Sequence, residues 1–169
     1  MKRKASHHML GMRRFVALGA LVAFASLGAV SLAIAAAPKF FSVTSSVDSA
    51  GGLVVNFDER GLGNVNVSYT VTADAAATYL CINNGGKNPS AANKRTFNRV
   101  VSGGGSFEVK NGRVQASLKA GPPSAGSFSC PKGQRLVLAS VSYTNIVLTD
   151  TTNGVSTSAP NASRTFFAV

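Results

Sequence analysis

The stretch VNVSYTVTA, residues 65–73, alternates apolar and polar side chains with a period of two. Its apolar members fall in one phase, and they are Val65, Val67, Tyr69 and Val71. This alternation is typical of a β-strand with one face in the core and the other in solvent. Since no window after residue 37 shows a helical repeat, the stretch predicts an all-β protein.

Segments of the same kind continue along the chain, with turn residues between them. Together they predict about nine short strands: FFSVTSSV, LVVNF, VNVSYTVTA, ATYLCIN, TFNRVV, the SFEVKNGRVQASLK hairpin, RLVLASVSYTNIVLTD, VSTSA and RTFFAV. Many short strands at this spacing are typical of a sandwich or a barrel. We predict a single β-sandwich, immunoglobulin-like in the loose sense, because Trp is absent and the cysteines have a different setting from those of antibody domains.

The SFEVKNGRVQASLK segment is the strongest local signal. Asn111 and Gly112 both tolerate positive φ, which a two-residue type I′ turn requires at its central positions. The turn then predicts a β-hairpin with Phe107 opposite Ala116. The preceding SGGGS run, residues 102–106, lacks the context of a phosphate-binding loop, and we interpret it as a flexible connection.

A change of phase in RLVLASVSYTNIVLTD predicts an irregular strand. Val141 and Tyr143 share one phase, whereas Ile146 and Leu148 fall in the other. We therefore expect a bulge or bend near Thr144 and Asn145.

The N-terminus predicts export. MKRKASHHMLGMRR carries five Lys or Arg and no acid, and about 22 uncharged residues follow it, as in a secretory signal peptide. Ala33 and Ala35 fit an A-x-A cleavage site, so we predict a signal peptide over residues 1–35 and a secreted domain over residues 36–169. An uncleaved membrane anchor is the alternative, because 18 or more apolar residues can span a bilayer.

Cleavage would remove both histidines and five of the 17 basic side chains, leaving 12 Lys or Arg against six acids, a net charge near +6. Without an imidazole, Ser-His-Asp, Cys-His and histidine-ligated zinc chemistry are excluded for the exported part. We expect no cofactor and no metal. A hydrolase with paired carboxylates stays open, and Asp58-Glu59 is the only close pair, although DERGLGN resembles a turn and adjacent strand residues face opposite ways.

Cys81 and Cys130 are the only cysteines, and both lie in the predicted exported part. In an oxidising compartment they are expected to form one disulfide. A reactive thiol or half of a metal site is the alternative, but no third cysteine or histidine is available there as a further ligand.

The segment TYLCINNGGKNPSAANKR, residues 78–95, runs from a strand into a polar, basic loop. Its cations and one beyond it form a candidate anionic-ligand surface: Lys87, Lys94, Arg95 and Arg99. The simpler interpretation is a solvated loop whose charges keep a strand edge from aggregating. Phe97 and Phe128 are the aromatic residues to watch for sugar stacking, and KRTFNR alone approaches a pattern for nucleic-acid binding.

TYLCINNGGKNPSAANK together with CPKGQRLVLASVSYTNIVLTDTTNG resembles a group of small secreted proteins of streptomycetes and related soil bacteria, each with a signal peptide and two cysteines. The resemblance covers most of the exported part. It implies export, the Cys81–Cys130 disulfide and a β-rich fold, and it carries over no catalytic residue.

We therefore expect a secreted, non-enzymatic binding or structural domain of the cell envelope or extracellular space. Its expected partners are anionic cell-wall polymers or an extracellular protein, with no specific nucleic acid, and with membrane contact only if the signal segment is kept. The alternatives are a secreted inhibitor or effector that acts on another protein through the 83–95 loop, and a carboxylate hydrolase.

Overall fold

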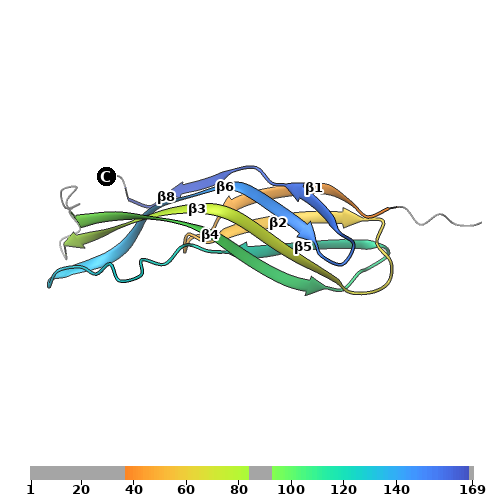
Figure 1. The fold of residues 1–169 in the computed structure, drawn as a ribbon, viewed down its shortest axis with the longest axis horizontal. Coiled ribbons are helices and arrows are strands. Elements are labelled where there is room, and N and C mark those ends of the chain that lie inside the picture. The colour runs from red at the N-terminus through yellow and green to blue at the C-terminus, as the bar shows by residue number, and fades with distance from the viewer. Residues whose placement is uncertain (1–36, 84–92, 168–169) are drawn as a thin grey trace, which may run out of the picture. The chain divides into compact units, whose positions relative to one another are not determined.

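The computed structural model describes residues 37–83 and 93–167, so the predicted signal segment lies outside the described residues. The described part contains strands and no α-helix, which confirms the all-β prediction (Figure 1). The strands are β1 (Lys39–Val47), β2 (Leu53–Arg60), β3 (Val67–Asn83), β4 (Lys94–Phe107), β5 (Arg113–Ala120), β6 (Gln134–Asp150), β7 (Val155–Ser158) and β8 (Ala162–Thr165).

The strands form two antiparallel sheets. One has the order β1-β2-β5, and the other has the order β4-β3-β6-β7, with β8 pairing to β6 beside β7. The apolar faces of both sheets contribute to one core, in which Val55 and Phe57 of the first sheet lie with Val71 and Tyr143 of the second. The fold is therefore sandwich-like, as predicted.

The strands are fewer and longer than the sequence indicated. The two predicted segments VNVSYTVTA and ATYLCIN are halves of a single strand, β3, which has 17 residues, as does β6. Asp74 does not break the strand, because it lies on the outer face and accepts a hydrogen bond from the Asn145 amide at 2.7 Å. Val65 lies before β3 and is 68% exposed, so its predicted place on the buried face is wrong.

The predicted bulge in β6 is confirmed. Val147 pairs with Thr72 and Thr144 pairs with Asp74, so two residues of β6 lie opposite the single residue between them on β3. Asn145 takes a φ of 51°, and both Tyr143 and Ile146 are buried on either side of it. The bulge therefore restores the apolar phase to the core face.

The turn at Asn111 and Gly112 is also confirmed, with φ values of 51° and 71°. Lys110 and Arg113 exchange two backbone hydrogen bonds across it. The predicted hairpin is wrong, however, because the flanking strands belong to different sheets and β4 pairs with β3 while β5 pairs with β2. The turn carries the chain from one sheet to the other.

The interpretation of SGGGS as a flexible connection is wrong, because Gly103 to Gly105 lie inside β4 and pair with β3. A Cβ atom on Gly103 would stand 1.8 Å from the backbone oxygen of Lys119 in β5. Glycine therefore lets the two sheets approach closely at the edge where β4 and β5 meet.

At one end of the five-stranded sheet, β3, β4 and β6 extend past the strands of the other sheet (Figure 1). Residues 121–133 cover the core-side face there, where the Tyr79 hydroxyl donates to the Pro123 carbonyl at 2.7 Å. The opposite face carries a second small apolar cluster of Leu80, Ile82 and Ala139, against which Phe167 packs. We call this part the extended end.

We predict that Gly103→Ala lowers the free energy of unfolding by about 2 kcal/mol or more, because the new methyl group would meet backbone and not a flexible side chain. Urea unfolding followed by circular dichroism measures the change. Gly63→Ala is the control, since nothing lies within 4 Å of its Cβ position. Equal stability of the two variants would contradict the close approach of β4 and β5.

Candidate functional site

The extended end is fastened by the predicted disulfide. Cys81 and Cys130 are bonded with an S–S distance of 2.07 Å, which confirms the pairing. Cys81 is buried in β3, and Cys130 belongs to the segment that precedes β6. The bond therefore holds residues 121–133 against the core-side face of the sheet, where no strand of the other sheet reaches (Figure 1).

Three of the four predicted basic residues lie on a strand and not in a loop. Lys94 and Arg95 begin β4, and Arg99 follows four residues later. Since side chains alternate along a strand, Arg95 and Arg99 share the core-side face, whereas Lys94 points to the other. Lys87 and most of the 83–95 loop lie outside the described residues, so the loop keeps its status as a prediction.

Two cations that were not predicted as site residues, Lys132 and Arg135, lie at the same end of the sheet as Lys94 and Arg95. Arg135 pairs with Ile82 on one side of β3, and Lys94 pairs with Leu80 on the other. Lys132 lies in the turn that enters β6 and is exposed, as Arg135 is. The disulfide was the available signal, because it brings the CPKGQR segment to the end of β3. We call Lys94, Arg95, Lys132 and Arg135 the basic end.

The carboxylates of the described residues are engaged elsewhere. Glu59 and Asp150 are fully buried, and Asp74 accepts its hydrogen bond from Asn145. Within residues 37–83 and 93–167 the ion pairs are Asp58 with Arg60 and Arg113, Glu108 with Lys110, and Asp48 with Lys119. None of these pairs involves the basic end, so its positive potential is not neutralised by a described carboxylate.

The aromatic residues next to the basic end pack against one another. The Phe97 ring lies 6.0 Å from Tyr79 and 6.5 Å from Phe128, and the Arg95 guanidinium lies 5.2 Å from the Phe97 centroid. All three rings are partly buried. Their faces are used for packing and for a cation–π contact. They therefore do not form the exposed platform for sugar stacking for which Phe97 and Phe128 were candidates.

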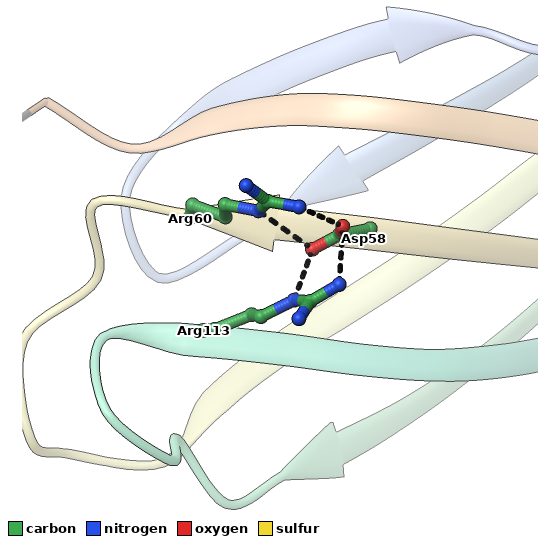
Figure 2. A network of polar contacts seen from close by, with 3 residues as sticks. All are labelled: Asp58, Arg60 and Arg113. Carbon is green, nitrogen blue, oxygen red and sulfur yellow. Dashed lines mark hydrogen bonds and ion pairs between the residues drawn. The ribbon is translucent and has the colours of Figure 1, made fainter.

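Asp58, which lies on the outer face of β2, is largely covered by the two arginines of an ion-pair network. Arg113 donates to it through two nitrogens, at 2.8 and 2.7 Å, and Arg60 donates at 2.9 Å (Figure 2). Arg113 above all, and then Arg60, hold the pKa of Asp58 well below its usual range. A carboxylate kept ionised in this way is a poor proton donor.

Glu59 does not lie in a turn and points into the core, away from Asp58. Its side chain is completely buried near Tyr69 and Asp150, and its two oxygens and the Tyr69 hydroxyl have no hydrogen-bond partner among the described residues. Burial raises the pKa of Glu59, and the Asp150 charge raises it further against the opposing effect of Tyr69. The two carboxyls therefore do not face a common cleft, as a glycosidase pair must.

The hollows of the described surface are shallow. The groove on the outer face of the five-stranded sheet has a volume of about 390 Å³ and is lined by Asp74, Ala76, Asn98, Val100, Ser142 and Thr144, with Ala75 and Arg99 beside them. No cluster of three or more Asp, Glu, Cys or His side chains in the described ranges could hold a metal ion. Those ranges also contain no helix long and apolar enough to cross a membrane.

We predict that Glu59→Gln stabilises the protein at neutral pH and not near pH 4. Because the folded-state pKa of Glu59 is raised, its protonated form stabilises the fold below the unfolded pKa, and this contribution is lost as the pH rises through the folded pKa. The difference in Tm between the variant and the original protein should grow between pH 4 and pH 8. A constant difference would show that the carboxyl does not change charge on that range.

Comparison of the chain with protein-family models, curated proteins and solved structures found no match.

Proposed function

We propose that this chain is an exported, non-enzymatic binding domain, immunoglobulin-like in the loose sense, that attaches to anionic polymers of the cell envelope. The observation that carries the proposal is the basic end, where Lys94, Arg95, Lys132 and Arg135 are exposed without an ion pair to any described carboxylate. Such a group attracts polyanions by long-range electrostatics and not by shape.

The disulfide supports an extracellular location. A bond between Cys81 and Cys130 persists in oxidising compartments and is rare in a reducing cytosol. In this proposal, the signal segment over residues 1–35 is removed and electrostatic contacts hold the secreted domain at the cell surface.

The placement of the cations favours a polymer over a small anion. Lys94 and Arg95 lie in β4, on one side of β3, and Arg135 lies in β6, on the other side. The charges therefore spread across three strands and do not converge on one enclosed cavity. Lys94 in β4 and Arg135 in β6 are two strands apart, a spacing of about 10 Å, which a chain of repeated anionic groups can span. A phosphate-bearing wall polymer such as a teichoic acid has this chemistry.

We predict that replacing Lys94, Arg95, Lys132 and Arg135 by Ser releases the secreted protein from isolated cell walls at low ionic strength. For the original protein, about 0.5 M NaCl should have the same effect, because the screening length then falls to about 4 Å. Cosedimentation with purified walls, with and without their anionic polymers, measures the bound fraction.

The matched control removes the same charge from elsewhere: Lys39, Lys110, Lys119 and Arg164, all exposed, are replaced by Ser. This variant should keep more wall binding than the basic-end variant. Equal losses would mean that net charge alone decides retention, and a wall-bound fraction indifferent to salt would refute the electrostatic proposal.

A further inference from the structure

β4 forms a long edge of the five-stranded sheet. It pairs with β3 in one unbroken register, from Leu80 opposite Lys94 to Val67 opposite Phe107, without a bulge. On its other side no described strand pairs with it. A straight edge strand of this length is a template for a further strand unless something blocks it.

The pairing of β3 determines which backbone groups of β4 point outward, away from β3. The Thr151 N–H donates to the Ser68 carbonyl at 2.9 Å, so even-numbered residues of β3 direct their backbone groups to β6 and odd-numbered ones to β4. In β4, the residues opposite those odd positions bond to β3, as Phe97 opposite Ala77 does. The outward donors and acceptors are therefore those of Thr96, Asn98 and Val100.

The second half of this edge packs against β5, because at Gly103 the backbone of Lys119 lies against the core-side face of β4. Before that point, β4 contains no proline and no bulge over residues 94–100. The described features that oppose unspecific pairing of a further strand with residues 94–100 are the charges of Lys94, Arg95 and Arg99. None of these residues makes an ion pair with a described residue.

These charges disfavour one pairing of two copies of the chain. If two β4 strands paired antiparallel around Phe97, Arg95 of one would lie directly opposite Arg99 of the other, and like charges in that position are destabilising. The same arrangement favours carboxylates on an incoming strand. Between the two arginines lies Phe97, and on the opposite face Val100 is 73% exposed.

We propose that residues 94–100 of β4 accept an extended segment of a partner protein that carries the pattern Asp/Glu-x-apolar-x-Asp/Glu. The segment adds as a strand to the edge and exchanges backbone hydrogen bonds with Thr96, Asn98 and Val100. Its two carboxylates pair with Arg95 and Arg99, and its apolar residue packs on Phe97. The pattern reads the same in both directions, so either strand orientation satisfies it.

The partner strand belongs to a different class of molecule from the proposed wall polymer, so either proposal can be refuted without the other. Backbone hydrogen bonds to Asn98 matter only for strand addition. Lys132 and Arg135 belong to the basic end but lie across β3 from the open edge, so Ser at both positions should weaken polymer binding and leave peptide binding intact.

The test uses the exported protein and a capped synthetic peptide, Val-Glu-Thr-Val-Thr-Glu-Val, with binding followed by calorimetry and by amide hydrogen exchange. We expect saturable binding, with slowed exchange at the amides of Thr96, Asn98 and Val100. Asn98→Pro removes one outward N–H at an edge position where proline is tolerated, and it should weaken binding by about tenfold or more. Asn98→Ala, which keeps the N–H, should bind as the original protein does.

An unchanged Tm shows that Asn98→Pro folds, and a second probe covers the case in which it does not. Two further peptides have the same sequence but carry N-methyl groups, the first at the Thr residues and the second at the Glu and central Val residues. Each lacks the backbone N–H donors at its methylated positions. At least one version should bind about tenfold more weakly. If both versions and polyglutamate bind as well as the peptide, charge alone explains the attraction, and strand addition is overturned in favour of a polyanion.

Discussion

The pairing of β3 with β6 is the constraint on which the rest of the structure depends. These two strands of 17 residues pair from Tyr69 opposite Asp150 to Asn83 opposite Gln134, and β4, β7 and β8 attach to their outer edges. The other sheet covers only part of that length (Figure 1). The excess length creates the extended end, which therefore needs a disulfide and a non-strand segment to cover its core-side face.

The same geometry separates charge within the domain. The acids lie mostly on the two-sheet part, where Asp58 is held by two arginines and where Glu59 and Asp150 are buried. The basic end lies where the core is thin and its cations face solvent. Because Glu59 and Asp150 are buried, their carboxyls are absent from the exposed surface, where the cations therefore predominate.

Local signals in the sequence were sufficient to predict strands, turns and bulges, but not which strands pair with one another. The alternation in residues 67–73, the turn at Asn111 and the bulge at Asn145 are properties of a few consecutive residues, and all three were predictable. The hairpin prediction was wrong because a turn fixes where the chain reverses, not whether its two arms join one sheet. Gly103 looked like a linker because its close neighbour, Lys119, is distant in sequence. Lys132 and Arg135 were missed for the same reason.

Arg95 is the residue at which the two proposed ligands meet. It belongs to the basic end through its position at the start of β4, and it shares a face with Arg99 along the open edge. Its guanidinium also lies over Phe97, which keeps its side chain close to the strand. An anion bound to Arg95 neutralises the charge that a second ligand would need. Lys132 belongs only to the polymer site, and Arg99 belongs only to the strand-addition site. The two proposed ligands should therefore compete at Arg95, and the wall-bound protein would offer its edge only to a partner strand whose carboxylate displaces the polymer.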